Sequence, residues 1–188
     1  MNKTIWLLLI SDVFLLTGFG LMQPILSIFI KENLLGGTIF AAGIAVMLFI
    51  LTKSLVQLPL SKIVDKRKRS FRIKIMIVGT FVVSTVPFIY IFSDNVIYIY
   101  LAQIIYGLGS GLAFPSWMGL WSKNSAIRHK SYDWSIYSTL TGIGTGIAAL
   151  IGATIAELFG FVYTFSLVGI LSLFACFVLL GLEMKTTQ

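Results

Sequence analysis

The feature that most constrains this chain is a series of six long apolar segments. They lie at about residues 4–30, 38–60, 75–92, 96–120, 135–156 and 158–182. Each comes close to, or exceeds, the roughly 20 residues that an α-helix needs to cross a bilayer. The segments are longer and more uniformly apolar than the alternating strands of about ten residues that build membrane barrels. We therefore predict an all-α membrane protein with six transmembrane helices.

Composition supports this prediction and argues against catalysis. The chain is 57% hydrophobic and 11% charged, which is too little polar surface to cover a soluble globule of 188 residues. The segments between the apolar runs are short, so we expect residues 1–188 to form a single transmembrane domain. Seven acidic residues, one His and one Cys provide no metal-ligand cluster and no nucleophile with a base. We expect no enzymatic activity, no metal and no cofactor.

Positive charge is distributed very unequally between the two ends of the predicted helices. One end carries twelve cations, and the other carries only Lys31; the twelve are Lys3, the seven Lys or Arg residues of 62–74, Lys123, Arg128, Lys130 and Lys185. By the positive-inside rule, the basic segments and both termini face the cytoplasm. Residues 61–74 are then a cytoplasmic loop whose cations meet anionic headgroups, so the expected partner is the lipid bilayer and not nucleic acid. We predict a multi-pass protein of a prokaryotic inner or plasma membrane.

The beginning of the chain also resembles a secretory signal, because Lys3 precedes an apolar run. The run has no cleavage site of the A-x-A kind and continues to residue 30. We expect it to remain as the first helix.

The tryptophans lie toward the predicted cytoplasmic ends of their helices; they are Trp6, Trp117, Trp121 and Trp134. Tryptophan is enriched where a membrane meets water, since its ring is apolar and its N–H is polar. We expect these side chains to form an interfacial aromatic belt.

A short pattern of small residues occurs twice. Gly18-x-Gly20-Leu21-x-x-Pro24 recurs 91 positions later as Gly109-x-Gly111-Leu112-x-x-Pro115. The first predicted helix runs outward and the fourth runs inward, as in a three-plus-three inverted repeat. The same offset makes Asp12 and Gln103 equivalent positions. Coincidence remains open as an alternative, because the chain has 17 glycines.

Two charged residues lie inside predicted helices. Asp12 follows Lys3 by nine residues and Lys53 precedes Ser61 by eight, so their depths match at about 13 and 12 Å, with a rise of about 1.5 Å per residue. An unpaired charge there costs at least about 2.5 kcal/mol. Three interpretations remain open: an ion pair, a proton-accepting Asp12 in a transport cavity, or a snorkelling Lys53 with a locally hydrogen-bonded Asp12.

Other polar residues continue the faces that carry these two charges. Lys53, Gln57 and Ser61 recur at four-residue spacing, and Gln23 falls on the same face of its helix as Asp12. Our candidates for a transport cavity are Asp12, Gln23, Lys53, Gln57, Gln103 and Tyr106. The alternative for each is a polar contact between helices.

The loop after the second predicted helix resembles motif A of the major facilitator superfamily. That motif has a Gly, an Asp four residues later, and then a second Gly followed by cations. Its positions here are Ser61, Asp65, Lys68 and Arg69, so both glycines are replaced. The resemblance covers essentially the whole chain and implies the amino-terminal half of a transporter fold.

Two further helices resemble motifs of the same family. The fourth has Gly107, Gly109, Ser110 and Gly111 in the pattern of motif B, with Gln103 in place of its Arg. The fifth has Gly144, Ala148, Ala149, Gly152 and Ala153 in the spacing of motif C, without its Pro. We predict close helix packing at Gly107, Gly111, Gly144, Ala148 and Gly152. The row continues to Ala156, and packing inside one bundle and contact with a second half both remain open for its members.

A transporter of this family has two six-helix halves that enclose a substrate site at mid-membrane. A homodimer would rebuild this architecture, and a second half-size protein or a longer parent chain are the alternatives. In the homodimer, the resemblance implies that Asp65 approaches residues 131–135 of the second subunit. The positive end of a helix there would favour the carboxylate by about 0.3–1 kcal/mol.

Two functions follow from this resemblance and these residues. The first is a secondary transporter of a small solute that works by alternating access, with proton coupling through Asp12 left open. The second is a membrane scaffold or assembly subunit, which gives Asp12 and Lys53 no purpose.

Overall fold

The structure, a computed structural model, describes residues 3–124 and 130–183 and has six helices that are long and apolar enough to span a membrane. This confirms the all-helical membrane fold predicted from the apolar segments. Arg128 and Lys185, two of the predicted cytoplasmic cations, lie outside the described residues. The helices are α1 (Lys3–Met22), α2 (Leu26–Asn33), α3 (Ile39–Asp65), α4 (Arg69–Ile91), α5 (Val96–Asn124), α6 (Lys130–Phe159) and α7 (Phe161–Glu183).

The first span is divided into two helices, whereas the sequence predicted one continuous helix over residues 4–30. Helix α1 ends at Met22, and α2 begins at Leu26 after a turn that contains Pro24. Proline has no backbone N–H, so it cannot donate to the carbonyl of Gly20 and the helical ladder is interrupted there. A second turn follows α2, where Gly36 has a φ of 77° that favours glycine.

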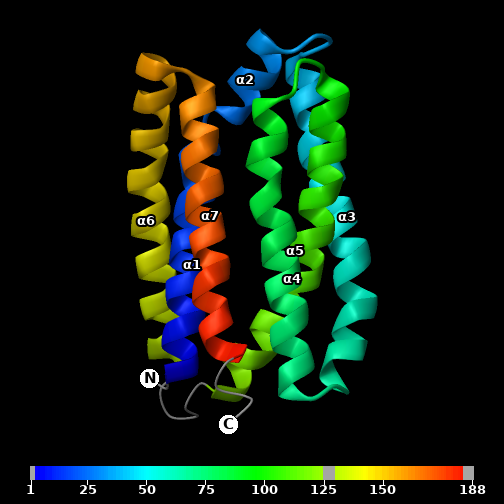
Figure 1. Cartoon of the computed structure of the whole chain (residues 1–188), viewed down its shortest axis with the longest axis vertical. Coiled ribbons are helices and arrows are strands. Elements are labelled where there is room, and N and C mark those ends of the chain that lie inside the picture. The colour runs from blue at the N-terminus through cyan, green and yellow to red at the C-terminus, as the bar shows by residue number, and fades with distance from the viewer. Residues whose placement is uncertain (1–2, 125–129, 184–188) are drawn as a thin grey trace.

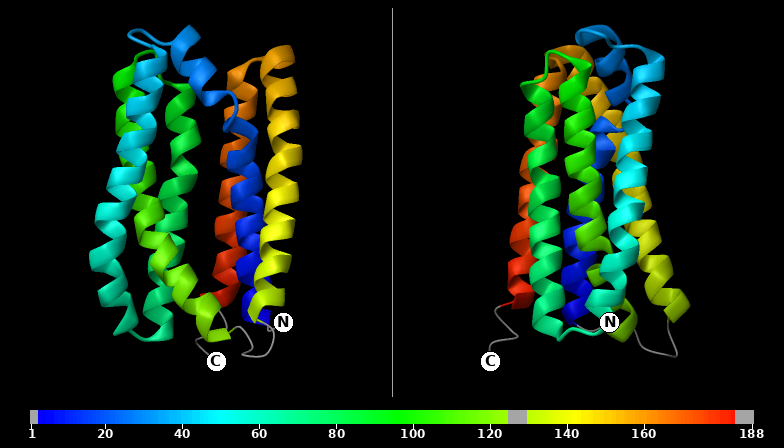
Figure 2. Two further views of the ribbon diagram at one scale, coloured as in Figure 1. Left: turned by 180° about the vertical axis from the view of Figure 1, so that it is seen from behind. Right: turned by 90° about the vertical axis from the view of Figure 1, so that its right-hand side faces the viewer.

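The membrane-spanning helices stand in two groups of three (Figures 1 and 2). One group contains α1, α6 and α7, and the other contains α3, α4 and α5. In the first group α1 packs against both of its neighbours, and in the second α5 does so. Contacts between α4 and α7 join the groups along their length.

One end of the bundle carries the turn between α3 and α4, with Lys66, Arg67 and Lys68; we call it the basic end. Helix α1 begins and α7 ends at this same end (Figure 1). At the opposite end, the turns before α3 and before α5 are paired by backbone hydrogen bonds. Leu35 N–H donates to the Asp94 carbonyl at 2.9 Å, and Val96 N–H donates to the Leu35 carbonyl at 3.1 Å. These bonds hold the α3 and α5 ends together.

The basic segment is mostly helical, which corrects the predicted loop over residues 61–74. Helix α3 continues to Asp65 and α4 begins at Arg69, so only Lys66–Lys68 connect them. Helices α5 and α6 likewise extend beyond their predicted bounds, to Asn124 and from Lys130. The sequence prediction ended each helix where its apolar run ended. Long cationic side chains can reach water from a helix that continues into the headgroup region, so the backbone does not need to stop there.

The core is divided between the two ends of the bundle. Near the opposite end, Phe29 of α2 packs edge-on against Phe165 of α7, with ring centroids 4.9 Å apart, and Tyr90 of α4 joins them. Near the basic end, Ile5, Leu8 and other apolar residues of α1 pack with residues of α4, α5 and α7. The charged residues of the predicted cavity lie between these two clusters.

Candidate functional site

A cavity of about 200 Å³ opens between the two helix groups and contains both of the intramembrane charges that the sequence indicates. We call it the charged cavity. Its lining comes from α1, α3, α4, α5, α6 and α7, so it lies where the groups meet. The lining residues are Asp12, Leu15, Leu16, Phe19, Phe49, Lys53, Met76, Thr80, Val83, Tyr106, Ser110, Ala113, Phe114, Trp117, Tyr137 and Leu179.

Asp12 is held on one wall of the charged cavity by two neighbouring helices. The hydroxyl of Tyr137 on α6 donates to Oδ2 of Asp12 at 2.8 Å. The preceding residue, Ser11, is buried and donates to the carbonyl of Ala175 on α7 at 3.0 Å. The two bonds fix the rotation of α1, so the carboxylate has a defined position and a neutral donor.

Lys53 is placed by the close approach of α3 and α5. Gly107 and Gly111 of α5 face the α3 backbone, and a Cβ on either would lie about 3.0 Å from a main-chain atom of Lys53. The ammonium lies over two aromatic rings of the cavity wall, 4.8 Å from the Phe114 centroid and 5.9 Å from the Phe49 centroid. This geometry is that of a cation–π interaction.

Asp12 and Lys53 line the same cavity, but these two described residues do not form the direct ion pair that was one interpretation of the sequence. Each charge instead has neutral partners: a phenol hydroxyl for Asp12 and two phenyl rings for Lys53. Both charged groups therefore remain available to a molecule in the cavity.

A stack of three aromatic rings closes the charged cavity toward the opposite end. Tyr106 of α5 lies between Phe19 of α1 and Phe49 of α3, with ring centroids 4.7 and 4.2 Å apart and interplanar angles of 14° and 19°. All three rings also line a second cavity. We call this arrangement the ring stack. It separates two spaces within the bundle.

The second cavity, which we call the neutral cavity, has a volume of about 310 Å³, and none of the described residues that line it is charged. Gln103 is 3% exposed, and its Oε1 has no hydrogen-bond partner among the residues that the structure describes. Gln23, Ser27 and Thr145 supply further polar groups. A buried amide oxygen without a partner is costly, so this position favours a hydrogen-bonding guest such as water or a polar solute.

The structure divides the predicted cavity residues between the two cavities. Asp12 and Lys53 line the charged cavity, Gln23 and Gln103 line the neutral cavity, and Tyr106 lines both. Gln57 lines neither of them. Sequence periodicity placed Gln57 one helical turn from Lys53 on the same face. It did not give the tilt of α3, which decides how far along that face the cavity extends.

Aromatic residues of α5 and α6 form the floor of the charged cavity at the basic end. Trp117 stacks on Trp121 with centroids 5.1 Å apart, and Trp134 and Tyr137 pack against both. The sequence predicted an interfacial aromatic belt, but Trp117 and Trp121 are only 5% and 4% exposed. Their burial corrects that prediction for these two residues. An indole fits a helix interface as well as a membrane surface, so the sequence alone does not separate these placements.

The turn between α3 and α4 is organised by Arg72, a residue that sequence analysis did not single out. Its guanidinium is buried and donates to the carbonyls of Asp65 at 2.9 Å and Arg67 at 3.3 Å. It therefore caps the end of α3. Nothing in the sequence distinguished Arg72 from the other six cations of residues 62–74.

The four motif A positions surround this turn. Ser61 donates to the Leu58 carbonyl at 2.8 Å, and Arg69 donates to the Thr4 hydroxyl of α1 at 2.9 Å. Asp65 ends α3 and Lys68 is the N-cap residue of α4. The expected contact between Asp65 and residues 131–135 of a second subunit stays a prediction.

The predicted row of small residues on α6 packs inside the bundle. A Cβ on Gly144 would lie 2.5 Å from Oγ1 of Thr17, and one on Gly152 would overlap the Leu21 carbonyl, both on α1. Ala148 is buried and Ala156 packs against the core. The row therefore brings α6 close to α1, as expected for packing inside one bundle.

The comparisons with known proteins agree with this architecture. A family model described as Major Facilitator Superfamily matches residues 8–187. The chain is 26% identical over 157 residues to the quinolone resistance protein NorA of Staphylococcus aureus, which covers 84% of this chain and 39% of NorA. It is 24% identical over 98 residues to the proton-coupled antiporter flippase LtaA of Staphylococcus haemolyticus, covering 52% of this chain and 25% of LtaA.

A solved structure has the same fold over almost the whole chain. The POT family transporter PepTSo matches with a TM-score of 0.82 and 18% identity, covering 98% of this chain and 38% of its own. The chain thus spans about two fifths of the length of NorA and of PepTSo.

Proposed function

The chain belongs to the Major Facilitator Superfamily, and we propose that it forms one six-helix half of a secondary transporter that carries a small solute across a bacterial plasma membrane. The observation that carries this proposal is the charged cavity. Asp12 and Lys53 reach it from two different helices, and each keeps its charged group on the cavity wall. Ionisable residues inside membrane helices are costly and usually mark a path for substrate or ions.

The proposal includes an inverted repeat of three spans each, in which α1, α3 and α4 correspond to α5, α6 and α7. The glycines of the repeated sequence pattern support it. Gly18 packs against α7, and its equivalent Gly109 packs against α4. The repeat makes α4 the counterpart of α7, so the two glycines meet equivalent helices. Gly20 packs against Thr145 of α6, and its equivalent Gly111 packs against Val56 of α3, and these helices are likewise counterparts.

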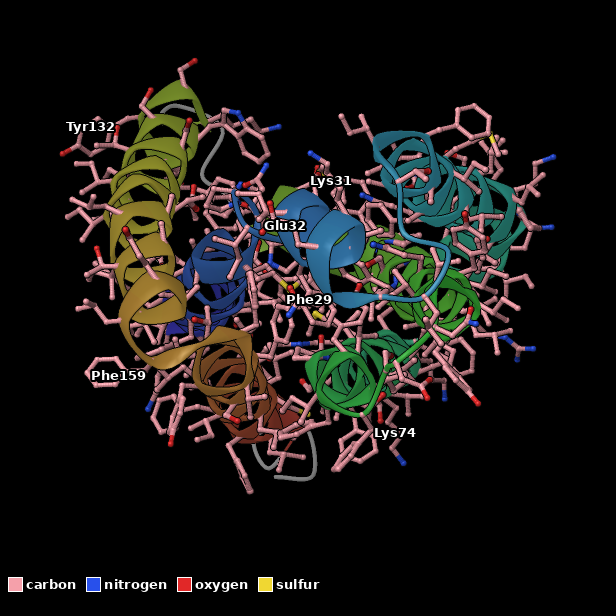
Figure 3. The ribbon with its side chains drawn as sticks, turned by 90° about the horizontal axis from the view of Figure 1, so that it is seen from above. Phe29, Lys31, Glu32, Lys74, Tyr132 and Phe159 are labelled. Carbon is pink, nitrogen blue, oxygen red and sulfur yellow. The ribbon has the colours of Figure 1, made fainter. Side chains whose placement is uncertain are left out.

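The proposal also includes a second six-helix unit. Helices α3 and α6 have only 17% and 11% of their most apolar windows buried, against 39–50% for the other spans. Tyr132 and Phe159, near the two ends of α6, lie on the outer side of the molecule (Figure 3). A second unit against these helices would supply the other wall of the passage, with the two units rocking around the solute. We favour a second copy of the chain as this unit, with Asp65 of one copy close to the start of α6 in the other.

The proposed orientation puts the basic end in the cytoplasm, because Lys66, Arg67 and Lys68 lie there with the ends of α1 and α7. Asp12 is the proposed site of proton coupling, since it is the acidic residue of the charged cavity.

Counterflow in liposomes tests the proposal. The chain is reconstituted and assayed with tritiated cationic, anionic, zwitterionic and neutral solutes. We expect counterflow of at least one class, and its loss in Asp12→Asn. Asp94→Asn makes the same change in an exposed turn and should leave flux unchanged. Flux that survives Asp12→Asn contradicts the assigned role of Asp12. An inactive chain that still binds a protein partner supports a scaffold.

A further inference from the structure

The two charges of the charged cavity are kept apart by neutral partners, which distinguishes them from a structural ion pair. Asp12 accepts a hydrogen bond from Tyr137 at 2.8 Å, and the Lys53 ammonium lies 4.8 Å from the Phe114 centroid. Both groups nevertheless face one space of about 200 Å³. A structural ion pair would have brought the two groups into direct contact, because unpaired charges at this depth are costly.

This arrangement favours a guest that carries both signs of charge. A cationic solute would compensate Asp12 but displace water from Lys53, and an anionic solute would do the reverse. In either case one protein charge would be left in a partly dehydrated cavity without a counter-charge, which is unfavourable. A solute with an ammonium and a carboxylate compensates both protein charges at once.

The remaining lining sets the character of the solute body. Phe49, Phe114, Trp117 and Tyr106 give the cavity aromatic walls, and Leu15, Met76 and Val83 add apolar surface. The volume is below the roughly 300–1,000 Å³ of sites for drug-sized ligands. We infer that the charged cavity binds a small amphoteric solute, with an ammonium at Asp12, a carboxylate at Lys53 and an apolar or aromatic body between the rings. This inference rests on the proposed function, because it names the class of solute carried.

Three probes with one ring and one spacer test the inference directly. Phenylalanine carries both charges, phenethylamine lacks the carboxylate, and 3-phenylpropionate lacks the ammonium. Their binding to the full chain in nanodiscs is measured by equilibrium dialysis at neutral pH. Because hydrogen bonds to charged groups are strong, we expect phenylalanine to bind about tenfold more tightly than either other probe. Equal binding of the three, or no binding of phenylalanine, would overturn the inference.

Two variants should then change which of the three probes binds most tightly. Asp12→Asn removes the negative charge that compensates the ammonium, so 3-phenylpropionate should bind at least as well as phenylalanine. Lys53→Met keeps an unbranched apolar chain, and phenethylamine should then match phenylalanine. Lys31→Met, an exposed change on α2, should preserve the original order. Circular dichroism confirms that each variant is helical. A uniform loss of all three probes in both variants would instead assign Asp12 and Lys53 a structural role and overturn the inference.

The binding measurement stands apart from flux. A preference for phenylalanine that exchanges in the variants supports the inference even if liposomes show no counterflow, in which case the transport proposal fails alone. Counterflow of cationic or anionic solutes only, with no preference for phenylalanine in dialysis, overturns the inference and leaves transport in place.

Discussion

At the scale of single residues, the hydroxyl of Tyr137 is the group on which the Asp12 carboxylate depends. We predict that Tyr137→Phe keeps the fold, because the ring still packs with Trp117, Trp121 and Trp134. The carboxylate loses its donor at 2.8 Å. Since hydrogen bonds to charged groups contribute about 1.5–3 kcal/mol, we expect solute counterflow or probe binding to fall about tenfold or more.

The matched control is Tyr132→Phe, on the first turns of the same helix. Tyr132 is 67% exposed, so the loss of its hydroxyl should change neither flux nor thermal stability. Equal activity of the two variants would show that the bond to Asp12 has no role in solute handling.

The sequence indicated Asp12 and Lys53 but not their partners. A charge within an apolar run is visible at once, because the run itself fixes its depth in the membrane. Tyr137 follows Asp12 by 125 residues, and a tyrosine fits a membrane surface, a core or a site equally well. Its role depends on how α1 and α6 cross, which local patterns do not contain.

At the scale of helices, glycines set how closely α3 approaches α5. In Gly107→Ala the new Cβ would lie 2.7 Å from the Phe49 carbonyl, so the two helices must separate. We expect the free energy of unfolding to fall by about 1–3 kcal/mol. Lys53 should also shift from its place over the rings. Thermal unfolding in detergent and probe binding measure the two effects.

Gly142→Ala is the control for this change. A Cβ at Gly142 meets nothing within 4 Å, and alanine is the better helix former by about 1 kcal/mol. The variant should be as stable as the parent or slightly more so. A destabilisation equal to that of Gly107→Ala would contradict the assignment of Gly107 to close packing.

The ring stack predicts a barrier between the two cavities. The chain has one cysteine, the buried Cys176, so Cys176→Ser gives a background for labelling. In that background, a cysteine at Ser110 reports access to the charged cavity. We expect Tyr106→Ala to speed labelling of Ser110→Cys by a membrane-impermeant reagent added on the side of α2.

Tyr106→Phe is the matched variant, because it keeps the ring and removes only the hydroxyl. Its labelling rate should equal that of the parent. Equal rates for Tyr106→Ala and Tyr106→Phe would show that the stack does not separate the cavities.

Among the helices, the sequence predicted their number and order, while their ends differed. Apolar runs mark the part of a helix inside the hydrocarbon, which is why six spans were visible. They do not mark the turns beyond it, such as residues 61–65 of α3 and 69–74 of α4. The interruption at Pro24 was also missed, because the apolar run resumes at Ile25, directly after it.

At the scale of the whole molecule, we expect two copies to associate through α3 and α6. Native mass spectrometry from nanodiscs should find a species of twice the 20.8 kDa mass of the chain. Cysteines at Asp65 and Ser131 on separate copies should form a disulfide, since both positions are exposed.

The matched pair for crosslinking is Asp65→Cys with Glu157→Cys. Glu157 is exposed on α6, the helix that carries Ser131, but it lies near the other end of that helix, so this pair should not react. Single chains throughout, together with no disulfide at Asp65 and Ser131, would contradict the dimer. The transport passage would then require a different second unit.

The sequence predicted six membrane helices in one domain, but it did not predict which face of each helix points out of the bundle. The row of Gly144, Ala148 and Gly152 looked equally suitable for contact inside the bundle and for contact with another unit. Only the position of α1 against this row decides between them. A helix has several faces, and a pattern of small residues does not say which neighbour each face meets.

The aromatic floor of the charged cavity gives the protein an optical reporter of its own. Three of the four tryptophans lie in it, and the stacked indoles of Trp117 and Trp121 are 5.1 Å apart. Rings this close should couple their electronic transitions and produce a paired band in circular dichroism. This pair lies within α5, whereas Trp134 is on α6, with its ring centroid 6.3 and 6.1 Å from those of Trp117 and Trp121. If α5 and α6 part at the basic end, Trp134 should leave the pair and the emission should shift to the red as water enters. Conformational changes could then be followed in the unlabelled chain.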